Sequence, residues 1–290
     1  MPAFLTLLIL WSPTGDPAHE HLNPLYREMV ETGVDVGGAP KLRLVAPSLS
    51  DGLDAKGQMA AIKALAKQDY ALDDLLEPSI VAPHIYRVET LPVGLADAAV
   101  HRIDVWFVAY GDFATVTRRD YLEQKLQQAQ RDRKVQRLKA EDLTQRGIAV
   151  PQNPDEGYSY SVAVILDRVQ LHTTSYSVTS RTADSLVLAS RVDGRFVNDR
   201  EYPNQWRLLD PDDATRLGPP RPYRGGGGYV KVTRLAQPKG ALFIESHTLF
   251  VEPKAWFDGG NLLSAKLPPA ISNEVRSLRR ELAKTRPGND

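Results

Sequence analysis

The chain has 290 residues, 42% of them hydrophobic and 25% charged, which is the composition of an ordinary globular protein long enough to bury its own core. Its 36 basic and 36 acidic residues cancel, which argues against a nucleic-acid-binding protein because neutralising phosphates requires a basic excess. Since the sequence has no cysteine, it cannot form disulfides, thiolate metal sites or a cysteine nucleophile.

An apolar run, Ala3 to Trp11, comes first and is followed by several Pro, Gly and Asp residues. The run is too short to span a bilayer and matches the hydrophobic region of a signal peptide. We therefore expect residues 1–18 to be a signal peptide ending at Gly15 or Ala18, and the protein to be exported to the periplasm or the extracellular space. No Lys or Arg precedes the run and no A-x-A pattern follows it, so the alternative is a buried first strand in a cytoplasmic protein.

Residues 19–79 predict a helical N-terminal extension. Helical spacing or a short helical turn is expected over Pro24–Thr32, Gly57–Lys67 and Asp73–Glu77.

Ahead of these segments, His19 and His21 alternate as two metal ligands would, but no third ligand lies nearby in the sequence. We interpret both histidines as part of a flexible terminus and predict no metal site.

Residues 80–290 predict one strand-rich domain. Segments rich in β-branched and aromatic residues indicate strands over His84–Leu91, Val100–Tyr110, Tyr158–Val169, His172–Ser180, Ser185–Val192, Gln205–Leu209, Tyr229–Leu235 and Ala241–Glu252. The Gly225–Gly228 tract leads into a strand and so lacks the helix N-terminus that a phosphate-binding loop needs. We interpret it as part of a long loop.

Two helices are expected among these strands. The first, Thr117–Arg146, is charged almost all round and is closed by Gly147, which is typical of a surface helix. The second, Pro268–Lys284, ends the domain. It carries one apolar stripe, made of Ile271, Val275, Leu278 and Leu282.

The closing order of elements resembles a known family. Within Gly240–Leu282 a long strand is followed by Trp256-Phe257, then by Leu267-Pro268-Pro269 and the last helix. This order is similar to the START-type helix-grip (SRPBCC-like) fold. The resemblance implies an α+β fold in which a curved antiparallel sheet meander packs against a long C-terminal helix, with additional N-terminal helices. It also implies an apolar cavity for a lipid-like ligand, but the family has no universal catalytic or contact signature to transfer.

One strand face combines polar and apolar residues. Glu245 and His247 are two apart in a strand and share a face with Phe243, and Asp104 lies two residues before Trp106 on another strand. If this face lines a cavity, the polar pair could orient a ligand head group or move a proton. The alternative, which we favour, is a solvent-facing or locally paired set.

Aromatic residues on strands either line a pocket or belong to the core. The residues that we select as candidate ligand contacts are Trp106, Tyr160, Tyr176, Phe243, Glu245, His247 and Leu278. No G-x-S-x-G, H-E-x-x-H or S-x-x-K motif occurs in a suitable setting, so we predict no catalytic residue and no cofactor.

Three functions follow as hypotheses. The first is non-enzymatic binding of an apolar or amphipathic, lipid-like small molecule by an exported protein. The second is a hydrolase or cyclase-like enzyme that uses Glu245, His247 and Asp104. The third is an interaction module of the cell envelope without a small ligand, which works through exposed sheet edges or the charged helix Thr117–Arg146. Basic residues of this helix and of the last helix could also make peripheral contact with the membrane or envelope, although a solvated helix face is the more common explanation. We predict no nucleic-acid partner, and the sequence leaves the oligomeric state open.

Overall fold

The computed structural model describes residues 16–37, 40–119, 121, 134–210, 213, 216–257 and 262–286, without the side chains of residues 262–264. The apolar run at the start of the chain, and with it most of the predicted signal peptide, lies outside the described residues. The three last residues of that predicted peptide, from Asp16 to Ala18, belong to the described fold.

The N-terminal part is helical, as predicted. Its elements are α1 (Pro17–Leu22), α2 (Pro24–Arg27), the π-helical turn Glu28–Thr32, α3 (Ala55–Ala66) and α4 (Leu72–Leu75). The side chain of Asn23 accepts a hydrogen bond from the backbone N–H of Tyr26 and so starts α2. Asp54 caps α3 in the same way, through the N–H of Gly57.

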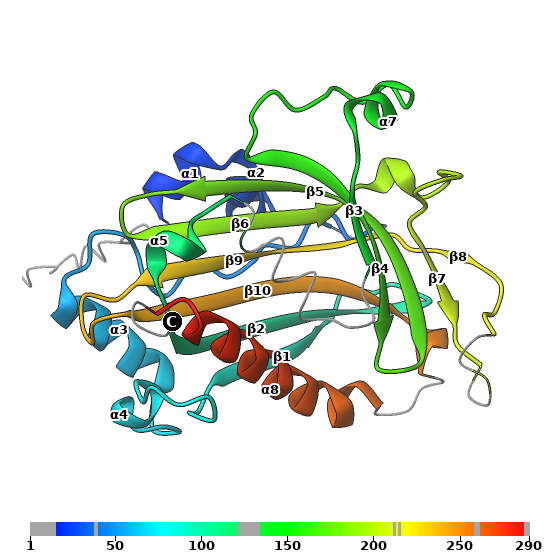
Figure 1. The fold of residues 1–290 in the computed structure, drawn as a ribbon. Helices are drawn as coiled ribbons and strands as arrows, with labels where there is room; N and C mark the ends of the chain where they lie inside the picture. The colour runs from blue at the N-terminus through cyan, green and yellow to red at the C-terminus, as the bar shows by residue number, and fades with distance from the viewer. Residues whose placement is uncertain are drawn as a thin grey trace, which may run out of the picture.

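One antiparallel sheet forms the body of the molecule (Figure 1). Its strands are β1 (Ile85–Leu91), β2 (Ala98–Tyr110), β3 (Lys134–Arg137), β4 (Glu156–Ile165), β5 (Val169–Arg181), β6 (Ser185–Val192), β7 (Gln205–Leu208), β8 (Arg221–Pro222), β9 (Gly226–Arg234) and β10 (Ala241–Pro253). They lie in the order β1-β2-β10-β9-β6-β5-β4-β3, and β7 pairs with β5 and β8. The long β4–β5 hairpin bends away from the central strands, so the sheet is curved.

The C-terminal helix α8 (Leu262–Ala283) crosses one face of the sheet (Figure 1). Its apolar stripe packs on alternate residues of the central strands, namely Val105, Phe107, Val232, Leu242 and Ile244. Arg279 adds a polar anchor, because its buried guanidinium donates to the carbonyl oxygens of Val108 at 2.9 Å and Pro83 at 2.8 Å. Burial lowers the pKa of Arg279 to about 10. We call this side of the sheet the α8 face.

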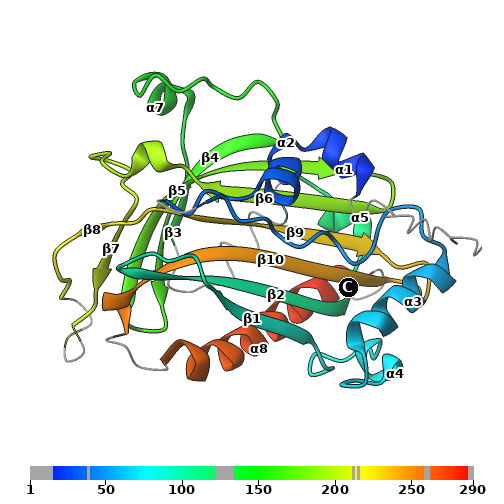
Figure 2. The ribbon, with the colours of Figure 1, turned by 180° about the vertical axis from the view of Figure 1, so that it is seen from behind.

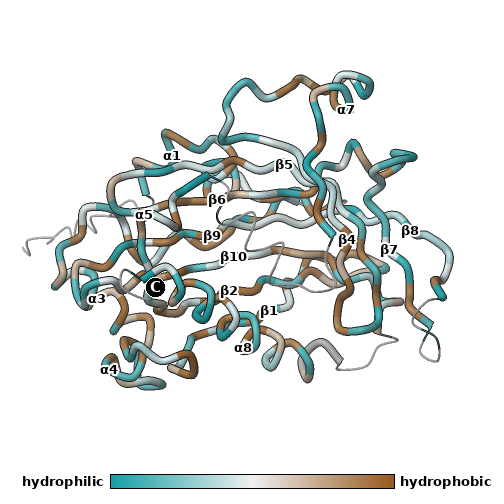
Figure 3. The backbone as a smooth tube through the Cα atoms, viewed as in Figure 1, coloured by the Kyte–Doolittle hydropathy of each residue, from teal (hydrophilic) through white to brown (hydrophobic). Residues whose placement is uncertain are grey.

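The N-terminal segment covers the opposite side, which we call the N-terminal face (Figure 2). There Leu25, Tyr26 and Met29 pack with strand residues such as Val178 and Tyr229 in the largest apolar cluster. Hydrophobic residues follow the central strands, whereas β5 is pale because of its Ser and Thr residues (Figure 3). The structure therefore confirms the predicted α+β class, with a curved antiparallel sheet, a long C-terminal helix and N-terminal helices.

The predicted helix over residues 117–146 is wrong for its described part. The short helix α5 (Phe113–Val116) ends just before it, Lys134–Arg137 is strand β3, and only the short helix α7 (Ala140–Thr144) lies near its C-terminal end. Residues 120 and 122–133 lie outside the described part of the chain. The reason is tertiary: β3 pairs with the edge of β4, and Leu138 and Leu143 are buried beside Tyr158. Gly147 does end a helix, with φ +64, but a shorter one.

Two further boundaries differ from expectation. The Gly225–Gly228 tract is not a loop, because Gly226–Gly228 are the first residues of β9 and pair with β10. Helix α8 begins at Leu262, so Pro268 and Pro269 lie within it.

Among the described residues, no helix is both long enough and apolar enough to cross a membrane.

Candidate functional site

The predicted ligand contacts do not form one site. Trp106, Phe243, Glu245 and His247 lie together on the N-terminal face and are at most 2% exposed. Leu278 lies on the other side of the sheet, in the packing of α8. Tyr160 and Tyr176 are on the distant β4–β5 hairpin, where their hydroxyls contact His172 at 2.5 Å and Glu156 at 2.7 Å. A ligand-binding role for the seven residues together therefore stays a prediction.

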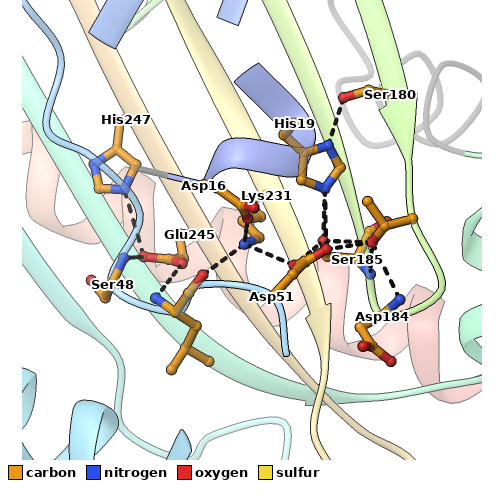
Figure 4. Close-up of polar contacts among 12 residues, drawn as sticks. Asp16, His19, Ser48, Asp51, Ser180, Asp184, Ser185, Lys231, Glu245 and His247 are labelled. Atoms are coloured by element: carbon orange, nitrogen blue, oxygen red, sulfur yellow. Dashed lines mark hydrogen bonds and ion pairs between the residues drawn. The ribbon is translucent and has the colours of Figure 1, made fainter. Parts of the chain in front are cut away.

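Glu245 holds the N-terminal segment on the sheet. Its carboxylate accepts hydrogen bonds from the backbone N–H of Ser48 at 2.7 Å and of Leu49 at 3.3 Å (Figure 4). The indole N–H of Trp106 donates to the same carboxylate at 3.2 Å. Since Glu245 is fully buried, these donors replace the water that an ionised carboxylate needs.

His247 lies between two carboxylates. Its Nδ1 is 2.8 Å from Asp104 Oδ1, and its Nε2 is 3.8 Å from Glu245 Oε2. Asp104 also contacts Arg102 Nε at 3.2 Å. The three groups that the enzyme hypothesis needs do converge, but Asp104, Glu245 and His247 are all 2% exposed or less, and a substrate cannot reach them. They are a locally paired set.

This pairing predicts a pH dependence of stability. Burial by itself lowers the pKa of His247, but the hydrogen bond to Asp104 and the negative charges of Asp104 and Glu245 outweigh burial and raise it above 6.5. A raised pKa in the folded state stabilises the fold below the unfolded-state pKa, and this stabilisation is lost as the pH rises through the folded-state pKa. We therefore expect the difference in unfolding free energy between the wild type and His247→Gln to shrink as the pH rises from about 6 to 9.

Denaturant unfolding at several pH values measures this difference. The control is His21→Gln, because His21 is exposed and its replacement should leave the pH profile unchanged. A difference between the wild type and His247→Gln that grows with pH would contradict the assignment of a charged His247.

A second buried cluster surrounds Lys231, which is fully buried on β9 (Figure 4). Its ammonium donates to Asp16, to the carbonyl of Leu49 at 2.6 Å, and lies 3.1 Å from Asp51 Oδ1. Lys231 is directly opposite Glu245 in the sheet, and Leu49 contacts both residues through its backbone. The two clusters together fasten residues 16–51 to β9 and β10.

His19 is part of this second cluster, which corrects its interpretation as a flexible terminus. It is fully buried, and its two ring nitrogens each lie 2.7 Å from a hydroxyl, Nδ1 from Ser180 and Nε2 from Ser185. Because Ser185 donates to Asp51 at 2.5 Å, its hydroxyl oxygen accepts a hydrogen bond from the Nε2–H of His19. Burial is the main cause that lowers the pKa of His19, and it therefore favours the neutral imidazole.

The cluster has the ligand types of a metal site. Asp16, His19 and Asp51 offer atoms within 4.8 Å of one another. The Lys231 ammonium already supplies the positive charge between the two carboxylates, and both nitrogens of His19 contact serine hydroxyls. These contacts indicate a structural ion-pair network. Sequence reasoning missed it because Asp16, His19 and Asp51 lie more than 100 residues before their partners Ser180, Ser185 and Lys231.

One accessible hollow lies on the α8 face. It has a volume of about 370 Å³ and lies across strands β5, β6, β9 and β10. The residues that line it alternate along each strand with the residues of the N-terminal face, because successive side chains of a strand point to opposite sides of the sheet. They are the apolar Leu171, Leu188, Val192, Val230 and Phe250 and the hydroxyl-bearing Thr173, Ser175, Ser190 and Thr248, all of them half-buried.

Glycines form the floor of this hollow. A Cβ on Gly228 would lie 2.5 Å from the carbonyl oxygen of His247, and one on Gly226 would lie 2.8 Å from that of Leu249. Strands β9 and β10 therefore approach too closely for any side chain at these positions, and the hollow remains open above them. This is the role of the Gly tract that the sequence suggested was a loop.

Together, the curved antiparallel sheet, the C-terminal helix across one face and the N-terminal helices define an α+β protein with a START-like helix-grip fold. No protein-family model matches the sequence, and no curated protein matches it.

Several solved structures are similar in fold. The human StarD13 (DLC2) lipid transfer and protein localization domain has a TM-score of 0.41 and 7% identity, over 77% of this chain and 95% of that chain. Human STARD10 has a TM-score of 0.36 and 9% identity, over 68% and 75%. A conserved protein from Geobacillus kaustophilus has a TM-score of 0.32 and 9% identity, over 63% and 95%.

Proposed function

We propose that the protein binds an apolar or amphipathic small molecule on the α8 face, without catalysing a reaction. The observation that carries this proposal is the half-buried hollow of about 370 Å³ between β5 and β10, which mixes aliphatic side chains with hydroxyls. This volume is within the usual range of small-molecule sites. On the opposite face, Leu25, Tyr26 and Met29 of the N-terminal segment pack on the central strands.

The hydroxyls favour an amphipathic ligand over a purely apolar one. Within the described part of the chain, the hydroxyls of Ser175, Ser190 and Thr248 make no hydrogen bond to another residue. They are therefore free to contact a polar head group, while Leu188 and Phe250 contact an apolar portion. Export, which the apolar run Ala3–Trp11 predicts, stays a prediction.

Filling the hollow tests this function. Leu188→Trp places an indole among the hollow's side chains and should weaken binding of a fluorescent fatty acid by about tenfold or more, because it removes the ligand's contact surface. Native mass spectrometry of the purified wild type, followed by lipid extraction, should also release a bound small molecule that the variant lacks.

The matched control is Leu22→Trp, since Leu22 is 49% exposed on α1 and far from the hollow. Thermal unfolding of both variants shows whether they are folded. If a folded Leu188→Trp binds the fatty acid as tightly as the wild type, or if the wild type neither binds it nor retains any small molecule, the proposed function is wrong.

A further inference from the structure

A second cleft, apart from the hollow on the α8 face, lies at the end of the sheet. It has a volume of about 890 Å³ and is formed where the turn between β9 and β10 meets α5 and the residues that follow α8. Leu53, Tyr110, Phe113 and Leu242 give it an apolar wall. Exposed residues of the β9–β10 turn, including Lys239, form its rim, so the cleft is open to solvent.

The acidic groups of this cleft already have partners. Asp184 forms an ion pair with Arg234 at 2.9 Å. Asp112 accepts hydrogen bonds from the hydroxyl of Thr115 at 2.7 Å and from its N–H at 3.0 Å, and so caps α5. Both carboxylates therefore already interact with donors of the protein itself.

Two cations in the same cleft have no such partner. Among the described residues, neither Lys239 nor Arg286 forms an ion pair. The guanidinium carbon of Arg286 is 4.9 Å from the centre of the Tyr110 ring, and its Nε is buried without a hydrogen-bond acceptor. A guanidinium stacked on an aromatic ring keeps its N–H edge free for an oxyanion. A buried donor without an acceptor also favours a ligand that supplies one.

We propose that this cleft binds a small anionic molecule that carries a carboxylate or phosphate group on an apolar or aromatic body. The anionic group would contact Arg286 and Lys239, and the body would pack on Phe113 and Leu53. The proposal is independent of the function assigned to the α8 face, because the two sites share no side chain.

Isothermal titration calorimetry of the full chain tests the proposal. It measures the affinity for three probes, namely phenyl phosphate, inorganic phosphate and benzoate. Phenyl phosphate should bind more tightly than inorganic phosphate, because only the former has an aromatic body. The double variant Arg286→Met, Lys239→Met should bind phenyl phosphate about tenfold or more weakly, since each charged hydrogen bond contributes on this scale. Comparing the affinities for phenyl phosphate and benzoate shows whether the cleft prefers a phosphate or a carboxylate group.

The matched control is Arg280→Met, Lys63→Met, which removes the same charges from exposed positions outside the cleft and should bind like the wild type. The hollow-filling variant Leu188→Trp should also bind phenyl phosphate like the wild type. Equal affinity of the cleft variant and the wild type would overturn the proposal. So would loss of binding in Leu188→Trp alone, or no binding of any probe to the wild type below about 10 mM.

Discussion

Replacing Lys231 by methionine is expected to lower the free energy of unfolding by about 3–5 kcal/mol. The ammonium is fully buried and bridges Asp16 and Asp51, which come from two parts of the N-terminal segment. Methionine fills a similar volume but leaves these carboxylates without a cation, and Asp16 is only 1% exposed. An uncompensated buried charge is among the most destabilising changes in a protein. Urea unfolding followed by tryptophan fluorescence measures the loss.

Two comparisons separate this explanation from a general effect of losing a lysine. Lys63→Met, at an exposed position of α3, should change the free energy of unfolding by less than about 0.5 kcal/mol. Adding Asp16→Asn to Lys231→Met should restore part of the stability, because it removes one of the unpaired charges. If Lys231→Met is as stable as the wild type, the ion-pair network does not fasten the segment.

The ion pair between Lys231 and Asp16 also bears on the predicted signal peptide. A leader that ends at Gly15 leaves Asp16 in the mature chain, whereas one that ends at Ala18 removes it. A chain that begins at His19 should therefore unfold at a lower urea concentration than one that begins at Asp16, because Lys231 loses Asp16 and keeps Asp51 and the carbonyl of Leu49.

Replacing Gly228 by alanine is expected to destabilise the fold by about 2–3 kcal/mol. The new Cβ would lie 2.5 Å from the carbonyl oxygen of His247 and 2.9 Å from the hydroxyl of Thr248. A backbone atom in a central strand cannot move aside as a flexible side chain does, so β9 and β10 must separate locally. Because Gly228 lies under the hollow on the α8 face, ligand binding there should weaken as well.

Gly194→Ala is the matched control for this change. A Cβ at Gly194 has no atom within 4 Å, so the substitution should leave the free energy of unfolding and ligand binding close to the wild-type values. If Gly228→Ala unfolds at the same urea concentration as Gly194→Ala, the close approach of the two strands is not a constraint on the fold.

The buried polar residues have a structural role in this molecule. Asp104, Glu245 and His247 meet as an acid–base set would, and yet residues 48 and 49 close over them. Their geometry therefore supports fastening of the N-terminal segment and gives no support to the enzyme hypothesis. The hollow on the α8 face carries aliphatic and hydroxyl side chains, which is the pattern expected of a binding surface.

Local sequence determined most of the strands and the C-terminal helix. The alternation in Ala241–Glu252 predicted a strand and showed that Glu245 and His247 share a face, because successive side chains point to opposite sides. The stripe from Ile271 to Leu282 likewise predicted the packing face of α8. The order of these elements was sufficient to indicate a helix-grip fold.

Only the tertiary structure decided which segment covers which face. Alternation cannot tell whether the face of Glu245 meets a cavity or another part of the chain, and here Ser48 and Leu49, almost 200 positions earlier, cover it. Pairing with β4 likewise makes Lys134–Arg137 a strand inside a helical pattern, and the closeness of β9 to β10 makes Gly228 a strand residue. These outcomes depend on contacts between distant residues, whose partners the local pattern does not contain.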